Sequence, residues 1–423
     1  MMLFLLYTAP LHLSAQSFSR VSPEDAGFCP ERLERLTHTL HSYLDQQRLS
    51  GGVTLVLHDG RALYFEAFGK RDTATETPMS EDALFRIASQ TKAIVSVGVM
   101  ILQEKGKLLI SDPIGNYLPE YMNTTVAERT GSAADPSEYK VYPARRPITI
   151  RDLLTHTAGI GYGYGPAADL WKEAGIQGWY FSDRDEPIRE TVRRMASLPF
   201  DAHPDEKFIY GYATDILGAL IEEASGKPLD VFLKEELFHP LGMHNTWFYV
   251  PREEAHRLAT VYSATEDRTI TRAPDTSGPV GQGHFVDGPR MSFSGGAGLV
   301  STAADYARFL QMMLNEGVLD GVRILSPKTV ALITSNHLDG ITFQPGLGMG
   351  LGFDVVLDIG IRGVPGSVGD FGWGGAYHTT YWVSPKDQLV VVFFTQLIPA
   401  RGSDIHGKLR TLLYQAQIGK TSN

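Results

Sequence analysis

A serine and a lysine stand three residues apart where a polar run gives way to an apolar one. Ser89 and Lys92 lie in the segment Phe85–Leu102, which reads FRIASQTKAIVSVGVMIL. If the chain is helical from Gln90 onward, residues i and i+3 share a face, and the hydroxyl and the amine meet. A serine at the start of a buried helix, beside a partly desolvated lysine, is typical of an activated nucleophile. The pattern predicts serine acyl-transfer chemistry.

The same Ser-x-x-Lys spacing occurs a second time, at Ser137 and Lys140. This copy follows Pro136 in a polar stretch, and no apolar helix comes after it. We therefore expect a solvated loop there. Because the motif alone is weak, the catalytic role of the first copy is argued from its context and not from the spacing.

Composition describes an ordinary globular protein. The chain has 423 residues, 43% of them hydrophobic, which is enough for one large domain or two closely packed ones. The net charge of −10 does not favour binding to nucleic acid or to an anionic membrane surface. A single cysteine, Cys29, excludes an internal disulfide and a cysteine-rich metal site, and no His-Glu-x-x-His motif occurs. We predict no metal and no cofactor, and no stable insertion in a membrane.

The first sixteen residues are apolar. Residues 1–16 end in Leu13-Ser14-Ala15, a plausible cleavage site, although Pro10 and His12 interrupt them and basic residues are missing. The segment predicts a signal peptide and therefore a periplasmic or secreted protein. The alternative is a short extension that packs on the surface of a cytoplasmic protein.

Both ends of the chain predict sheet. Apolar segments 52–58 and 62–68 flank the turn Asp59-Gly60, a strong hairpin signal. Segments 377–383 and 389–397 form a second hairpin near the end of the chain. A helix from Pro30 precedes the first hairpin, and another near residues 405–413 follows the second.

The middle of the chain predicts helices. Thr149 and Asp152 form a capping-box pattern that opens a helix through about Thr157. Further helices are expected over residues 186–199, 213–225 and 229–237, and another over 303–315 behind a second capping box at Thr302 and Asp305. We predict an α/β sheet domain from residues 21–110 and 291–420, a mostly helical domain from 111–290, and the active site between them.

Three other stretches carry candidate site residues. The loop Gly159–Gly165 has two tyrosines, Tyr162 and Tyr164, and follows a helix, so it suits a cleft wall better than a phosphate loop. Tyr210 and Tyr212 stand just before a predicted helix. Glycines in the segment Gly372–Tyr377 precede a strand and would let a ligand or another backbone approach closely.

Together with Ser89-Gln90-Thr91-Lys92, these stretches resemble the family VIII carboxylesterases, relatives of class C β-lactamases and D-alanyl-D-alanine peptidases. The resemblance runs from about Val21 to about Leu413 and includes the segments Pro147–Thr157 and Ser294–Thr302. It implies a β-lactamase-like fold: an antiparallel sheet flanked by helices, with an inserted, mostly helical domain.

The resemblance also implies roles for single residues. Ser89 would be the nucleophile, and either Lys92 or Tyr210 would take its proton. The backbone N–H groups of Ser89 and Ala376 would form the oxyanion hole. The remaining residues expected to contact substrate are Tyr162, Tyr164, Tyr212, Trp373, Gly374 and Gly375.

Two departures from the lactamase pattern favour an esterase. Trp373-Gly374-Gly375 stands where lactamases have Lys-Thr-Gly, and Tyr212 replaces the asparagine of Tyr-x-Asn. The first change removes a cation that would pair with a substrate carboxylate. We therefore predict hydrolysis of small esters of short to medium acids. The alternatives are a β-lactamase or D-alanyl-D-alanine peptidase, and a non-catalytic scaffold that binds acyl or cell-wall ligands.

Overall fold

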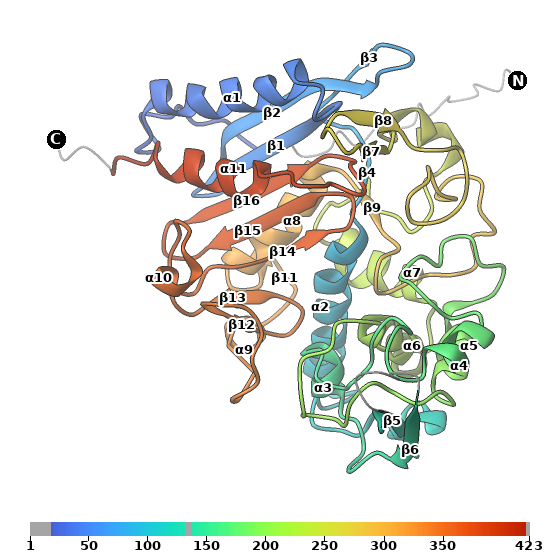
Figure 1. Ribbon diagram of the computed structural model, residues 1–423. Coiled ribbons are helices and arrows are strands. Elements are labelled where there is room, and N and C mark those ends of the chain that lie inside the picture. The colour runs from blue at the N-terminus through green and yellow to red at the C-terminus, as the bar shows by residue number, and fades with distance from the viewer. Residues whose placement is uncertain (1–17, 132–137, 420–423) are drawn as a thin grey trace, which may run out of the picture.

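The computed structural model describes residues 18–131 and 138–419. The predicted signal peptide and Ser137 lie outside these ranges. The described chain forms a large sheet with helices packed on both faces and, beside it, a region made mostly of helices (Figure 1). The predicted fold class, an antiparallel sheet flanked by helices, is confirmed.

The sheet has eight antiparallel strands in the order β12-β13-β14-β15-β16-β1-β2-β3. It joins segments from the two ends of the chain, because β1 pairs with β16 from Val53↔Phe394 to His58↔Leu389. Its strands are β1 (Gly51–His58), β2 (Arg61–Asp72), β3 (Thr77–Pro78), β12 (Leu347–Met349), β13 (Asp354–Val356), β14 (Phe371–Gly375), β15 (Thr379–Ser384) and β16 (Leu389–Phe394).

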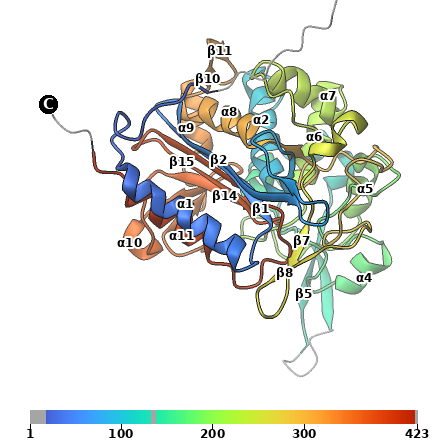
Figure 2. The ribbon, with the colours of Figure 1, turned by 90° about the horizontal axis from the view of Figure 1, so that it is seen from above.

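Side chains of the central strands alternate between two apolar cores, as the period of a strand requires. In β16, Val391 and Phe393 face the core beneath helices α1 (Pro30–Asp45) and α11 (Ile405–Tyr414), while Val390 and Val392 face the other core. Figures 1 and 2 both show α1 and α11 side by side on one face of the sheet. The other core includes helix α8 (Ala303–Leu314).

Helix α2 (Thr91–Glu104) links the sheet to the helical region. It packs against α6 (Ala213–Ser225), and Gly98 permits the approach, since a Cβ there would lie 3.0 Å from the side chain of Ile221. The other helices are α3 (Ile150–Leu154), α4 (Ala168–Glu173), α5 (Ile188–Met195), α7 (Leu229–Leu233), α9 (Pro327–Ile333) and α10 (Ile359–Arg362).

Short hairpins and paired segments complete the fold. Two of the hairpins lie within residues 111–290, the part of the chain that the sequence predicts to be mostly helical. The strands are β4 (Phe85–Arg86) with β9 (Val300–Ser301), β5 (Thr125–Arg129) with β6 (Tyr139–Pro143), β7 (Tyr262–Ala264) with β8 (Ile270–Arg272), and β10 (Val318–Leu319) with β11 (Val322–Arg323).

Local signals predicted helix starts better than helix ends. The capping box of Thr149 and Asp152 is present, but α3 ends at Leu154, three residues before the predicted end. Thr302 caps α8, whereas the carboxylate of Asp305 accepts from the backbone N–H of Asn245 instead of closing a capping box. For Asp305, a contact with a distant loop residue thus replaces the local contact of a capping box. No described helix is both long and apolar enough to cross a bilayer.

Candidate active site

Ser89 lies in a short 3₁₀ turn, Ala88–Gln90, that leads into α2. From Ala83 to Leu102 every residue is buried except Ser89, which is partly exposed. Ala88 has a φ of 41°, a backbone region that residues other than glycine rarely adopt. This forced turn presents the one accessible side chain of the stretch, and strained backbone of this kind concentrates at functional sites.

Lys92 is the second residue of α2 and is buried, with 2% of its surface exposed. Its ammonium nitrogen lies 2.7 Å from the carbonyl oxygen of Gly296, 3.2 Å from the hydroxyl of Tyr162 and 3.4 Å from the hydroxyl of Ser89. An ammonium group has three N–H donors, so each donor has an oxygen within reach. The predicted contact between Ser89 and Lys92 is therefore present in the structure.

Two tyrosines flank the amine of Lys92. Its nitrogen lies 4.6 Å from the centre of the Tyr210 ring, and the rings of Tyr162 and Tyr210 meet edge to face with 5.8 Å between centres. Burial, with a contribution from Tyr210, holds the pKa of the Tyr162 hydroxyl well above its usual value. Tyr162 therefore remains a neutral phenol near pH 7, which suits hydrogen bonding and not proton abstraction.

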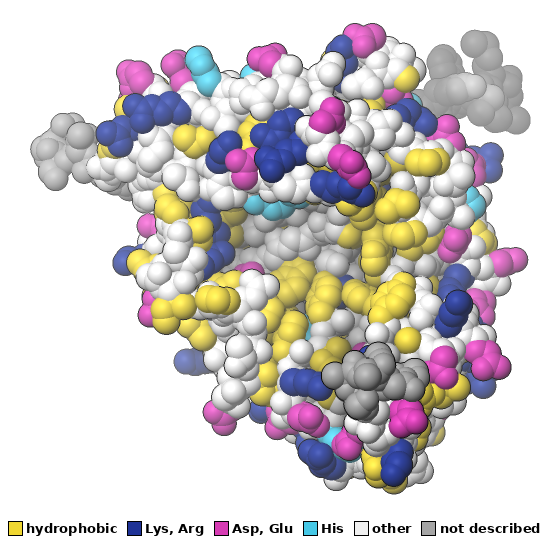
Figure 3. Space-filling model, in the orientation of Figure 1, with side chains coloured by type: hydrophobic (Ala, Val, Ile, Leu, Met, Phe, Trp, Pro, Cys, Tyr) yellow, Lys and Arg dark blue, Asp and Glu magenta, His cyan; other side chains and the backbone are white. Residues whose placement is uncertain are grey.

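Trp373 closes the site from the side of the sheet. Its indole N–H donates to the hydroxyl of Tyr210 over 3.2 Å, and its ring stacks on Phe343 with 6.2 Å between centres. Phe343 also contacts Phe208, which stacks on Tyr210. The walls around the amine of Lys92 are thus aromatic. In the space-filling view the molecule is hollowed near its centre, with hydrophobic side chains around the hollow (Figure 3).

The end of β14 approaches the backbone that precedes Ser89. Beyond Gly372, β14 pairs with β15 alone, so its other edge is free of strand pairing. A Cβ at Gly375 would lie 2.4 Å from the carbonyl oxygen of Ile87, a separation that only glycine permits. Ala376 packs in the same small cluster as Ala88. The two segments predicted to supply the oxyanion-hole amides are therefore in contact.

A buried carboxyl group supports Lys92 from behind. Asp215, on α6, accepts from the hydroxyl of Ser294 over 2.6 Å and from the backbone N–H of Gly296 over 3.1 Å. Burial raises the pKa of Asp215, while these hydrogen bonds and Lys92 lower it in part. Because Gly296 presents its carbonyl oxygen to Lys92, Asp215 helps to fix the position of the amine.

His156 packs against Tyr210, one of the two tyrosines beside Lys92. Its ring centre lies 4.7 Å from that of Tyr210, and it is 2% exposed. Burial and the nearby Lys92 lower the pKa of His156 to about 3. The imidazole is therefore neutral at physiological pH and adds no second positive charge beside Lys92.

Comparison with known proteins shows the family of the chain. The family model described as "Beta-lactamase" matches residues 36–414, which is most of the chain. The chain belongs to the beta-lactamase family. The resemblance to the family VIII esterases that the motifs indicate is confirmed within this family.

Relatives in the family include esterases. The chain is 32% identical over 375 residues to "Esterase EstB" of Burkholderia gladioli, covering 85% of this chain and 89% of the relative. It is 34% identical over 381 residues to "Protein Rv1367c" of Mycobacterium tuberculosis, with the same coverage. The solved structure of "EstCE1, a hydrolase with promiscuous acyltransferase activity" superposes with a TM-score of 0.76 at 28% identity, covering 92% of this chain and 99% of the other. The family and its esterases make this chain a serine hydrolase.

One predicted substrate contact, Tyr212, differs from the expectation. Tyr212 is fully buried and donates its hydroxyl to the carbonyl oxygen of Gly178 over 2.7 Å, so it packs behind the site and does not face a ligand. Tyr164 is 66% exposed, and its neighbour Tyr162 is the one that reaches Lys92. Trp373, Gly374 and Gly375 lie along the free part of β14 and are partly exposed.

Other members of the site were missed. Asp215 and Gly296 belong to stretches that the sequence singled out, yet no local pattern indicated that they act on Lys92. Phe343 lies in an irregular segment between α9 and β12, and nothing in its sequence neighbourhood indicated a cleft wall. Among the described residues, no group of three or more His, Cys, Asp or Glu side chains could hold a metal ion.

Proposed function

We propose that this serine hydrolase cleaves uncharged carboxylic esters of short to medium acyl chain length. The observation that carries the proposal is Trp373, which stands where the lactamase pattern has a lysine and which contacts both Tyr210 and Phe343. A carboxylate beside the scissile bond would be buried against this aromatic wall without a cation, at a cost in free energy. An acyl chain would gain from the same contact.

The reaction proceeds through an acyl-enzyme on Ser89. Lys92 in its uncharged amine form, or the phenolate of Tyr210 held beside it, takes the hydroxyl proton while the oxygen attacks the ester carbonyl carbon. The backbone N–H groups of Ser89 and Ala376 stabilise the oxyanion that forms. The proton passes to the departing alcohol, and water then attacks the acyl group to release the acid and restore Ser89.

The other candidate functions share parts of this site. A β-lactamase or D-alanyl-D-alanine peptidase would use the same serine, but its substrate carries an anion that Trp373 cannot pair. A non-catalytic binding scaffold would not need a lysine amine within 3.4 Å of a serine hydroxyl. The contacts of Trp373 and Lys92 therefore support the esterase over both.

A panel of p-nitrophenyl esters of graded acyl length, assayed beside a penicillin and a cephalosporin, tests the proposal. We expect kcat/KM to be highest for neutral esters of two to about eight carbons and at least a hundredfold lower for the penicillin. A penicillin that is preferred over every ester would overturn it. The absence of turnover for all these substrates would favour the binding scaffold.

A further inference from the structure

A cavity lies beside α7 and the chain that follows it, and Phe293, next to the Ser294–Gly296 segment, is part of its lining. Its volume is about 500 Å³, within the roughly 300–1,000 Å³ usual for small-molecule sites. None of the catalytic candidates lines it: Ser89, Lys92, Tyr162, Tyr210 and Trp373. The cavity is therefore separate from the proposed ester site.

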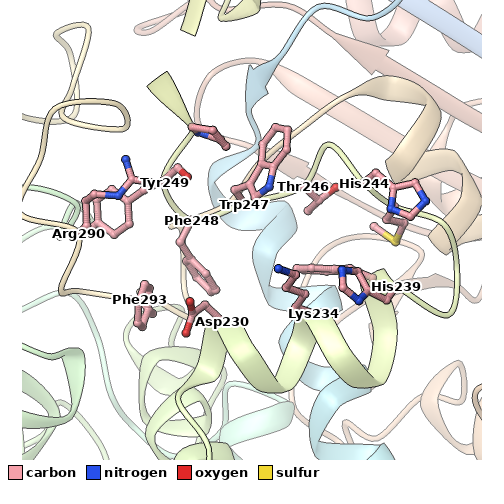
Figure 4. Close-up of a pocket in the computed structure, with 13 residues that line it drawn as sticks. Asp230, Lys234, His239, His244, Thr246, Trp247, Phe248, Tyr249, Arg290 and Phe293 are labelled. Atoms are coloured by element: carbon pink, nitrogen blue, oxygen red, sulfur yellow. Dashed lines mark hydrogen bonds between the residues drawn. The ribbon is translucent and has the colours of Figure 1, made fainter. Parts of the chain in front are cut away.

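Two polar groups face each other across this cavity. Figure 4 shows Lys234 and Trp247 on opposite sides, with the nitrogen-bearing edge of the indole directed toward the end of the lysine chain. Among the described residues, no ion pair is found for Lys234 and no hydrogen bond for the indole N–H. An ammonium group without a hydrogen-bond partner and an N–H donor without an acceptor are suited to the two oxygens of a carboxylate.

The backbone beneath these donors is well fixed. Trp247 exchanges two backbone hydrogen bonds with Val300, of 3.0 and 2.7 Å, and the hydroxyl of Thr246 bonds to that of Ser301. Lys234 begins a π-helical segment, Lys234–Phe238, directly after α7. π-helical turns are rare and occur often at functional sites, where they redirect side chains.

The rest of the lining is aromatic and, on balance, positively charged. Phe238, Phe248 and Phe293 supply flat apolar surface. The guanidinium N–H groups of Arg290 donate to backbone carbonyl oxygens, and no ion pair is found for Arg290 among the described residues. The carboxyl group of Asp230, four residues before Lys234, also lines the cavity, and one of its oxygens is buried without a hydrogen-bond partner. Burial raises the pKa of Asp230, and the charge of Lys234 partly opposes that shift.

From these contacts we infer that the cavity is a binding site for a small monocarboxylate with a flat or short apolar body. The carboxylate lies between Lys234 and Trp247, and the body lies against the phenylalanines. Phe293 immediately precedes Ser294, so an occupied cavity adjoins the segment that holds Lys92. The inference does not depend on the reaction at Ser89.

Binding of 2-naphthoate to the full-length Ser89→Ala protein, measured by isothermal titration calorimetry, tests this site. Its neutral counterpart is 2-naphthalenemethanol, which has the same ring system and no charge. We expect one naphthoate per chain, bound at least tenfold more tightly than the alcohol, since only the carboxylate can accept charge-assisted hydrogen bonds. Naphthoate should also bind wild-type protein whose Ser89 carries a covalent phosphonate.

Two substitutions and one matched control complete the experiment. Lys234→Gln should weaken naphthoate binding about tenfold or more, and Trp247→Phe, which keeps the ring and removes the N–H, about threefold. Lys328→Gln on α9 removes another exposed lysine, which lies outside the cavity, and should leave naphthoate binding unchanged. Equal binding of acid and alcohol, unchanged binding in Lys234→Gln, or loss of binding after phosphonate labelling would overturn the inference.

Discussion

The ammonium nitrogen of Lys92 lies 2.7 Å from the backbone carbonyl oxygen of Gly296. The other side of the same residue is held by Asp215, whose carboxyl group accepts the backbone N–H of Gly296 and the hydroxyl of Ser294. A buried acid on α6 thus reaches the amine on α2 through one loop residue. This relationship makes Asp215 a positioning residue for Lys92.

Asp215→Asn should lower kcat about tenfold or more while leaving KM nearly unchanged. The amide keeps the volume of the carboxyl group and an oxygen at the place of Oδ1, which accepts both hydrogen bonds, but it lacks the negative charge that strengthens them, so Gly296 and the amine are held less firmly. Asp305→Asn is the matched control, because Asp305 is also buried and also binds a backbone N–H, at Asn245. Steady-state kinetics on both variants measure the two effects. Equal falls in kcat would contradict the positioning role.

The two tyrosines beside Lys92 should differ in importance. Tyr210→Phe should reduce kcat by roughly 10²–10⁴-fold, the range ascribed to a positioned acid–base group. Tyr162→Phe should reduce it by less than about tenfold, because the Tyr162 hydroxyl accepts a hydrogen bond from Lys92, whereas the family resemblance gives the acid–base role to Tyr210. Lys92→Ala should reduce kcat at least as much as Tyr210→Phe does. A larger loss in Tyr162→Phe than in Tyr210→Phe would reverse the assignment.

The parts of the fold that follow local rules were predictable. The turn at Asp59-Gly60 has φ values of 49° and 73°, as the Asp-Gly pair requires, and the hairpin β1–β2 forms around it. The pairing of Ser89 with Lys92 follows from one turn of helix. Both depend on residues that are near in sequence.

The parts that depend on packing between distant segments were not predictable. Phe343 meets Phe208 and Trp373 only because the sheet and the helical region are in contact. The buried position of Tyr212 follows from a hydrogen bond to Gly178, which lies in a different loop. A motif read along the chain cannot tell which of two neighbouring tyrosines faces the cleft.

Trp373→Lys should shift the substrate preference toward anions. The new ammonium group would offer a partner to a carboxylate, and the stacking on Phe343 would be lost. We expect the ratio of kcat/KM for a neutral p-nitrophenyl ester to that for a penicillin to fall at least tenfold. Trp373→Phe, which stays uncharged, is the control and should keep the ratio. An unchanged ratio in the lysine variant would show that Trp373 does not contact substrate.

The buried His378 should make stability fall in acid. Burial lowers its pKa to about 3, whereas in the unfolded chain the pKa is near 6.5. Between these values the unfolded state binds a proton that the folded state does not, so the free energy of unfolding decreases as pH falls from about 6.5 toward 3.

Removing this imidazole should flatten that dependence. His378 has a φ of 65°, which asparagine tolerates, so His378→Asn is the substitution of choice. Urea unfolding between pH 6 and 4 should give a slope about 1.4 kcal/mol per pH unit smaller than that of wild type. The exposed His38→Asn should leave the slope unchanged. An unaltered slope in His378→Asn would contradict the burial argument.

The central claim, that Ser89 carries the acyl group, is tested most directly by a rapid burst experiment followed by mass spectrometry. Wild-type protein mixed with p-nitrophenyl butyrate should release close to one equivalent of p-nitrophenol at once, with the butyryl mass on the peptide that contains Ser89. Ser89→Ala should show neither burst nor turnover, while Ser137→Ala, in the second Ser-x-x-Lys copy, should match wild type. Turnover that persists in Ser89→Ala, or an acyl group found on another residue, would contradict the account.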